Sequence, residues 1–287
     1  MATVGTLLAL LSSAMWGTSD FLGGTASRRL SPIGVVAVSE AFGLLGVFVV
    51  AVATGSLSAS PGYVGWALLA AGSGTAGILA FYKALATGTM GVVAPIAALG
   101  VAVPVLVGIA GGDRPTVAQG AGLVIAIAGV VLAGGPEVRA ADRPRHVAIR
   151  PLLLAVVAAI GFGIVFVAID RGARTSTVMT LVVMRAASVV ILLVVAALTS
   201  RRVLAVGVGA LPTLAVVGGF DVGANAAFGY ASRHGLLSLV SVLSSLYPAV
   251  TAVLARVIHA ERLRPVQLVG VCAALAGVAL IASAGVG

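Results

Sequence analysis

Charged side chains are scarce in this 287-residue chain, at 9% of residues, against about 25% in ordinary soluble domains. Hydrophobic residues make up 60% of the chain, and the mean hydropathy is +1.20. This composition excludes an ordinary soluble globular protein. We therefore expect an integral membrane protein, multi-pass in the cell membrane, with the lipid bilayer as a partner.

Cysteine and histidine are also rare. The single cysteine, Cys272, cannot form a disulfide within the chain. The three histidines lie in or beside the connectors between apolar segments, and the many glycines lie inside those segments. The sequence therefore contains no cluster of metal ligands and no phosphate-binding glycine loop. We expect no metal, no cofactor, no hydrolysis of ATP and no enzyme activity.

Basic residues outnumber acidic ones, with a formal net charge of +9. The lysines and arginines are scattered over short connectors and do not gather on one face, as they would in a nucleic-acid-binding protein. Their distribution is typical of residues that set membrane topology. Nucleic acid is therefore not an expected partner.

Apolar segments long enough to cross a bilayer, at roughly 20 residues each, occupy nearly the whole chain. Backbone groups in lipid must be satisfied within the segment, so these segments are predicted to be helices. The fold class is thus all-α, with ten transmembrane helices. They are predicted at residues 4–24, 32–54, 61–86, 89–111, 116–134, 151–169, 176–198, 207–232, 235–257 and 265–284.

An internal duplication organises the chain. When residues 238–281 are moved back by 148 positions they fall on residues 90–133, and the two segments agree in kind. Asp113, Arg114, Gln119, Gly122 and Gly129 meet Glu261, Arg262, Gln267, Gly270 and Gly277, and Tyr82 meets Tyr230 at the same offset. We therefore predict a five-helix repeat at residues 1–134, a basic connector at 135–150 and a second five-helix repeat at 151–287.

An odd number of spans in each repeat has a geometrical consequence. The first span and its copy, the sixth, must cross the membrane in opposite directions, so the repeats are inverted. Inverted repeats place a binding site near the midplane, where the two halves meet, and provide two related conformations. This arrangement favours a transporter.

Two motifs give the chain a family resemblance. The first is the pair Trp16-Gly17 in the first span, which corresponds to Phe162-Gly163 in the second half. The second is the connector Glu261-Arg262 followed by Gln267 and Gly270, with Ala-Gly-Val-Ala-Leu ending at Leu280. With these motifs the chain resembles the EamA-type members of the drug/metabolite transporter superfamily, over nearly its whole length.

The resemblance implies a ten-helix carrier built from two inverted five-helix repeats. Many such proteins export amino acids, metabolites or toxic compounds, and relatives carry sugars or nucleotide-sugars. Two positions depart from the usual pattern: Gly100 stands opposite Pro248, where proline is common in both halves, and Glu40 stands where a basic residue is common. We therefore do not transfer a particular substrate.

Ionisable residues inside a span are default candidates for contact with a solute or an ion, because burying them in lipid is costly. Asp20 lies one turn beyond Trp16 on the same helix face. An aromatic ring and a carboxylate on one face suit a cationic or amphipathic solute. The alternative is that Asp20 pairs with Arg28 or Arg29 near the end of the span.

Glu40 and Arg185 lie at equivalent depths in the second span of each half. Glu40 either binds substrate or protons, or forms a buried pair with Lys83 or Arg185. Arg185 cannot lose its charge. It therefore needs an anionic group on the substrate or a carboxylate partner within the chain.

The eighth and ninth spans supply the remaining candidates. Asp221 and Asn225 lie one turn apart in the middle of the eighth span, and they contact the substrate or a coupling proton, or else they hydrogen-bond a neighbouring helix. In the ninth span Ser241 and Tyr247 lie close to Pro248 and offer hydroxyl groups to a polar path, although its serines also suit tight packing. The predicted substrate-binding residues are Trp16, Asp20, Glu40, Arg185, Asp221, Asn225, Ser241 and Tyr247.

These observations predict a secondary transporter that moves a small organic solute by alternating access, most simply as an exporter, with protons as a candidate coupling ion. The alternatives are a membrane enzyme that acts on a lipid-linked substrate, a sugar or nucleotide-sugar carrier of the same fold, and a passive channel. The count of basic residues places the connectors after the odd-numbered spans in the cytoplasm and both termini outside. The family resemblance implies both termini inside.

Overall fold

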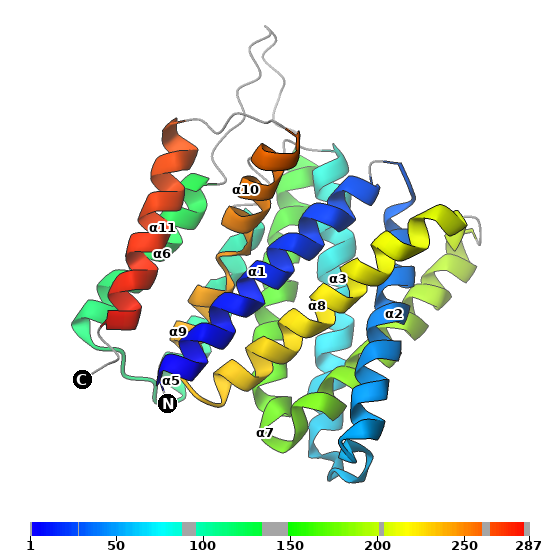
Figure 1. The fold of residues 1–287 in the computed structure, drawn as a ribbon, viewed down its shortest axis with the longest axis horizontal. Coiled ribbons are helices and arrows are strands. Elements are labelled where there is room, and N and C mark those ends of the chain that lie inside the picture. Colours follow the sequence, from blue (N-terminus) through cyan, green and yellow to red (C-terminus); the bar gives the residue numbers. More distant parts are fainter. Residues whose placement is uncertain are drawn as a thin grey trace, which may run out of the picture.

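The computed structural model of the chain describes residues 2–27, 29–87, 96–133, 149–200, 204–259 and 265–283. Within these ranges the secondary structure is helical and contains no strand, which confirms the predicted all-α class (Figure 1). The α-helices are α1 (Ala2–Ser27), α2 (Pro32–Ala53), α3 (Val64–Thr87), α5 (Ala102–Ala110), α6 (Val117–Ala133), α7 (Ile149–Thr199), α8 (Leu211–Ser232), α9 (Leu237–Ser244), α10 (Tyr247–His259) and α11 (Pro265–Ser283). Short 3-10 turns are η1 (Ser56–Ser58), η2 (Pro61–Tyr63), η3 (Leu99–Val101) and η5 (Val208–Ala210).

Two parts of the sequence predictions lie outside the described residues. They are the start of the fourth predicted span, at residues 89–95, and most of the predicted basic connector, at residues 135–148.

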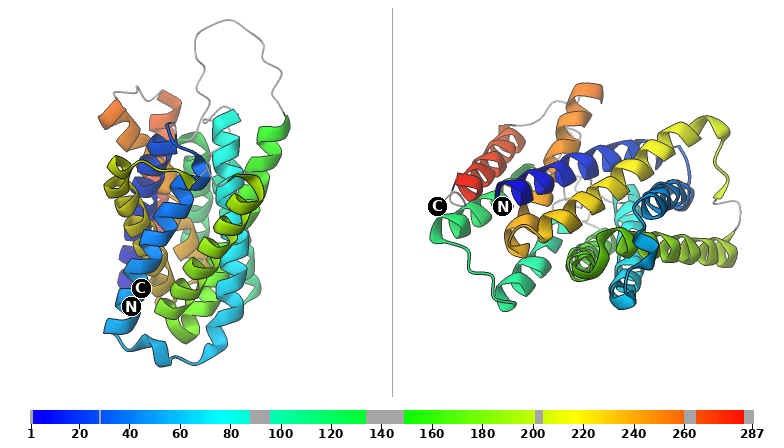
Figure 2. Two further views of the ribbon diagram at one scale, coloured as in Figure 1. Left: turned by 90° about the vertical axis from the view of Figure 1, so that its right-hand side faces the viewer. Right: turned by 60° about the horizontal axis from the view of Figure 1, so that its bottom comes forward.

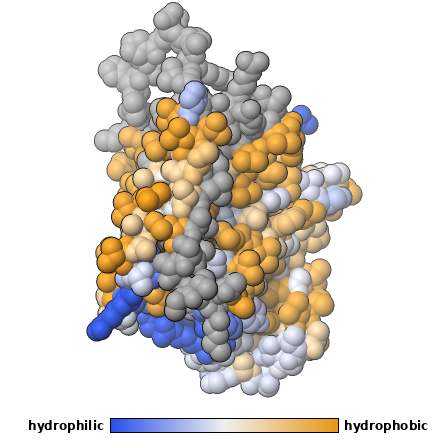
Figure 3. All heavy atoms as spheres, turned by 60° about the vertical axis from the view of Figure 1, so that its left-hand side comes forward, coloured by the Kyte–Doolittle hydropathy of each residue, from blue (hydrophilic) through white to orange (hydrophobic). Residues whose placement is uncertain are grey.

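The helices present apolar side chains to their surroundings. Leu7, Leu45 and Leu106 expose 62, 60 and 67% of their surface, and similar residues cover much of the face shown in Figure 3. Four described segments are long and apolar enough to cross a membrane: Pro32–Ala53, Pro61–Ala84, Leu152–Thr199 and Val208–Ser232. Exposed leucine at this density is stable in lipid and is what a membrane-spanning bundle requires.

Helix α7 differs from the prediction of two spans separated by a connector at residues 170–175. Those residues are helical, and the only non-helical backbone inside α7 is at Ser176, with φ −160° and ψ 111°. Ser176 acts as an N-cap for the part of α7 that follows, because its Oγ accepts a hydrogen bond from the backbone N–H of Met179 at 3.2 Å. The chain therefore reverses at one residue.

The ninth predicted span, at residues 235–257, is divided into α9 and α10. Helix α9 ends at Ser244 and α10 begins at Tyr247. Pro248 has no N–H to donate to the carbonyl of Ser244, so the helical hydrogen-bond ladder cannot continue through this point. The break lies about halfway along the predicted span.

The first helices of the two halves run in opposite directions. Helix α1 begins at the end of the molecule where the N-terminus is marked, and α7 begins at the opposite end (Figures 1 and 2). This is the relation that inverted repeats require.

Glycines allow the first helix of each half to contact the other half. A Cβ at Gly17 in α1 would lie 2.5 Å from the Cβ of Val250 in α10. A Cβ at Gly163 in α7 would lie 2.5 Å from the carbonyl oxygen of Gly100, in η3. The two close approaches are repeat-related, and each joins helices from different halves.

Helices α6 and α11, the last helix of each half, pack against each other at one side of the bundle (Figure 1). A Cβ at Gly277 would lie 2.6 Å from the backbone nitrogen of Ala126 and 2.7 Å from the carbonyl oxygen of Gly122. Small residues thus let these two backbones approach closely.

The contact between α2 and α8 offers a stability test with an adjacent control. A Cβ at Gly218 would overlap the carbonyl oxygen of Ser39, whereas a Cβ at Gly219 would meet nothing within 4 Å. We expect Gly218→Ala to lower stability by about 1–3 kcal/mol, because the helices must separate. Gly219→Ala should leave stability unchanged or slightly higher, because alanine favours a helix over glycine.

The measurement is thermal unfolding of the purified variants in detergent. Equal midpoints for Gly218→Ala and Gly219→Ala would show that the two helices do not approach each other as closely as described.

Candidate functional site

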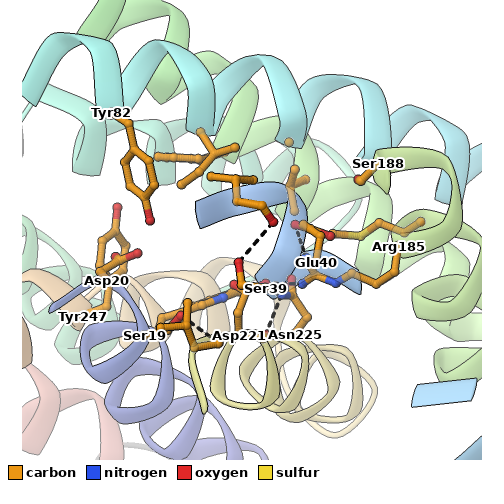
Figure 4. Close-up of a pocket in the computed structure, with 18 of the residues that line it drawn as sticks. Ser19, Asp20, Ser39, Glu40, Tyr82, Arg185, Ser188, Asp221, Asn225 and Tyr247 are labelled. Carbon is orange, nitrogen blue, oxygen red and sulfur yellow. Dashed lines mark hydrogen bonds and ion pairs between the residues drawn. The ribbon is translucent and has the colours of Figure 1, made fainter. Parts of the chain in front are cut away.

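A cavity of about 120 Å³ lies between helices of both halves (Figure 4). The predicted residues that line it are Trp16, Asp20, Glu40, Arg185, Asp221, Asn225 and Tyr247. Further lining residues include Ser19, Val36, Ser39, Ile78, Tyr82, Phe162, Val165, Phe166 and Ser188. The cavity therefore brings seven of the eight predicted residues together, from α1, α2, α7, α8 and α10.

Arg185 is the centre of an ion cluster at one side of the cavity. Its guanidinium is 2% exposed, and it pairs through Nη1 with Glu40 Oε1 and through Nη2 with Asp221 Oδ2. Glu40 comes from α2 in the first half, whereas Arg185 and Asp221 come from α7 and α8 in the second. The cluster thus joins three helices across the boundary between the halves.

This geometry answers the question left open for Arg185. Both of its carboxylate partners belong to the chain, and Arg185 is one of the two partners considered for Glu40. A planar guanidinium presents several donors in a fixed fork, which suits two carboxylates at once. Glu40 Oε2 and Arg185 Nε are buried and make no hydrogen bond to any described residue. Charge attraction therefore holds the cluster more than a complete set of hydrogen bonds does.

Asp20 belongs to a separate group on the other side of the cavity. Figure 4 shows its side chain beside those of Tyr82 and Tyr247, away from Arg185 and Glu40. The Tyr82 hydroxyl also reaches α1, where a Cβ at Gly23 would lie 2.9 Å from it. Asp20 makes no ion pair with any described residue, a set that includes Arg29 but not Arg28.

Aromatic rings close one side of the cavity. The ring centroids of Trp16 and Phe166 are 5.3 Å apart, and those of Phe166 and Phe228 are 4.8 Å apart. Trp16 also lies 6.1 Å from Phe228 and 6.4 Å from Tyr247. These separations are in the favourable range for aromatic pairs, so α1, α7, α8 and α10 share one aromatic cluster.

Asn225 bonds within its own helix. Its Nδ2 donates to the backbone oxygen of Asp221 at 2.7 Å and lies 3.5 Å from Asp221 Oδ1. The link from α8 to a neighbouring helix is made instead by the Asp221 carboxylate, through Arg185.

Ser241 lies away from the cavity lining. It is fully buried, and its Oγ has no hydrogen-bond partner among the described residues. Two other serines of this region bond to backbone: Ser244 Oγ donates to the Ala9 oxygen at 3.3 Å, and Ser245 Oγ donates to the Ser241 oxygen at 2.7 Å. These contacts fit the packing interpretation of the serines.

Tyr82 is the main lining residue that the sequence did not single out. Its only signal was the match with Tyr230 across the repeat, and the two differ in place: Tyr82 is 7% exposed, whereas Tyr230 is 41% exposed. Ser19 was also missed; its Oγ donates to the Val217 oxygen at 3.0 Å and ties α1 to α8.

A second charged group lies outside the cavity, near the turn of α7. Asp170 is 2% exposed and pairs with Arg174 at 3.2 Å and with Arg171 at 3.8 Å. Arg233 donates to the Ala173 oxygen at 3.3 Å. None of the groups in the described part of the chain places three potential metal ligands together.

Comparison with known proteins decides the family. The model of the EamA-like transporter family matches residues 3–135 and again residues 149–283. The chain belongs to the EamA-like transporter family. The two matches correspond to the two halves of the sequence duplication.

A solved crystal structure shares the fold of this EamA-like protein. It has a TM-score of 0.77 and 21% sequence identity, and the match covers 96% of this chain and 95% of that one. No curated protein matches the chain. Family membership and the apolar helices together make it a multi-pass membrane protein of a transporter family.

The ion cluster predicts an unusual order of stabilities. Arg185→Gln should lower the free energy of unfolding by about 3–5 kcal/mol, because it leaves two carboxylates without their counter-charge. Adding Glu40→Gln and Asp221→Asn to Arg185→Gln should restore much of the loss, because the uncompensated charges are then gone.

Thermal unfolding in detergent at neutral pH compares the single and triple variants. If the triple variant unfolds at or below the temperature of Arg185→Gln, the carboxylates are not held by the guanidinium.

Proposed function

We propose that this EamA-like protein is a secondary transporter that moves a small organic solute by alternating access, in the direction of export. In this proposal the chain forms ten transmembrane helices, as inverted five-helix repeats at residues 1–134 and 151–287. The observation that supports it most directly is a cavity between the halves, lined by charged and aromatic side chains from both.

The position of the cavity supports a two-state mechanism. On α1, α2 and α3 the lining residues come from the parts nearer the end of the molecule at which α7 begins. Towards the other end the aromatic cluster of Trp16, Phe166 and Phe228 lies against the cavity, and the group around Asp170 lies beyond it. In the proposed cycle this second end opens when the first one closes.

The alternatives fit the cavity less well. Sugar recognition needs free hydroxyl groups, but Ser19 and Ser39 donate to the backbone oxygens of Val217 and Val36. A nucleotide-sugar needs cationic groups for its phosphates, but Arg185 is already held by two carboxylates. An enzyme for lipid-linked substrates needs its reactive groups at a membrane face, whereas these lie well inside their helices.

Transport can be tested before the solute is identified. A ligand-stabilisation screen across amino acids, sugars, nucleosides and organic cations first selects a solute, whose flux is then measured in proteoliposomes. We expect saturable flux that falls at least about tenfold in Asp221→Asn and in Glu40→Gln, a loss of about 1.4 kcal/mol or more.

Asp113→Asn is the matched control, because Asp113 lies outside the cavity and accepts a hydrogen bond from the Ser238 amide that asparagine can also accept. Normal flux in both cavity variants would remove these residues from the proposed site. The absence of saturable flux for every solute would contradict the transporter.

Coupling to protons is a separate part of the proposal. The cavity lining holds three carboxylates and one guanidinium, so a proton and a solute can compete for the same excess negative charge. An imposed pH gradient should therefore change the initial rate of solute flux in proteoliposomes. Identical rates with the gradient in either direction and without it would rule out proton coupling.

A further inference from the structure

The charges on the cavity lining do not balance. Among the described lining residues the carboxylates are Asp20, Glu40 and Asp221, and Arg185 is the basic side chain. Arg185 is held by Glu40 and Asp221. Asp20 is the carboxylate left without an ion pair in the described part of the chain.

The surroundings of Asp20 are aromatic. Tyr82 lies beside it at 7% exposed, and Tyr247 completes the group in Figure 4. Trp16 precedes Asp20 by one turn of α1, and its ring lies 6.4 Å from that of Tyr247. Three electron-rich rings from α1, α3 and α10 thus surround one carboxylate.

A positive charge suits this place on two physical grounds. It would be attracted by the Asp20 carboxylate, and the faces of tryptophan and tyrosine rings attract cations, by about 0.5–2 kcal/mol for each contact. Both attractions grow as water is excluded from the cavity. A neutral solute would remove water from Asp20 and return neither attraction.

A negative charge would find no free counter-charge among the described lining residues. To reach Arg185, an anion would have to displace Glu40 or Asp221, and the displaced carboxylate would then lie unpaired in a buried position. Breaking a buried ion pair in this way costs about 3–5 kcal/mol. The same cost applies to the carboxylate of a zwitterionic solute.

We propose that the cavity binds an organic cation, with its ammonium group at Asp20 between Tyr82, Tyr247 and Trp16. The apolar part of the solute lies against Val36, Ile78 and Val165, which also line the cavity. This inference rests on the proposed transport function, and it names the charge class of the solute.

The two tryptophans of the chain make a direct binding measurement possible. Trp16 lines the cavity, whereas Trp66 lies outside the lining and is 39% exposed. In Trp66→Phe the remaining tryptophan fluorescence comes from Trp16 alone. Its change on addition of a probe to the purified protein gives a dissociation constant.

The probes share a phenyl ring and differ in charge: phenylethylammonium, neutral 2-phenylethanol, anionic 3-phenylpropanoate and zwitterionic phenylalanine. We expect phenylethylammonium to bind at least about tenfold more tightly than each of the others, a difference of about 1.4 kcal/mol. Equal affinities, tighter binding of the anion or zwitterion, or no saturable response to the ammonium compound would overturn the inference.

Asp20→Asn in the Trp66→Phe background should reduce the preference for phenylethylammonium over 2-phenylethanol to within about twofold, because the main charge attraction is gone. Asp20→Glu should keep the preference. Asp113→Asn makes the same chemical change outside the cavity and should also keep it. A preference that persists in Asp20→Asn would overturn the role of Asp20, and the charge series with the native carboxylate stands even if this variant does not fold.

Flux separates this inference from the proposed function. Saturable transport of a neutral, anionic or zwitterionic solute, with phenylethylammonium neither bound nor carried, would overturn the cation site and leave the transporter standing. Tight binding of phenylethylammonium without flux of any solute would support the cation site and contradict transport.

Discussion

The pairing of Arg185 with Glu40 and Asp221 is the interaction on which the interior of this protein depends. A permanent positive charge in the middle of an apolar bundle is tolerated only with nearby negative charge, and here that charge comes from α2 and α8. One guanidinium thus fixes three helices and both halves relative to each other. It also determines the polarity of the cavity, because it uses two carboxylates and leaves Asp20 to face the space alone.

Much of this arrangement could be predicted from the sequence, because membrane burial makes every charge informative. Glu40 and Arg185 stood out because each lies deep in an apolar segment, and their equivalent depths made a pair plausible. The duplication predicted opposite directions for α1 and α7, which the structure shows. Pro248 predicted a bend, and the helix is indeed divided between Ser244 and Tyr247.

Other features could not be predicted because they depend on how helices rotate about their axes. Asp221 as a second partner of Arg185 requires a particular face of α8 to meet α7, which hydropathy does not specify. Tyr82 matched Tyr230 in sequence, yet only Tyr82 faces the cavity, since the two halves pack differently at this point. Residues 170–175 were expected to be a connector because they are polar. They remain helical, with Arg171 and Arg174 both near the buried Asp170.

The exchange of contacts between the halves has a consequence for biosynthesis. Gly17 in α1 finds its close partner, Val250, in α10, which the ribosome completes more than two hundred residues later. The first half therefore enters the membrane with its main contact face unpaired, and neither half owns a complete core. Such a chain is expected to assemble late, after α10 has been inserted, and its early helices must be kept from other partners in the bilayer until then.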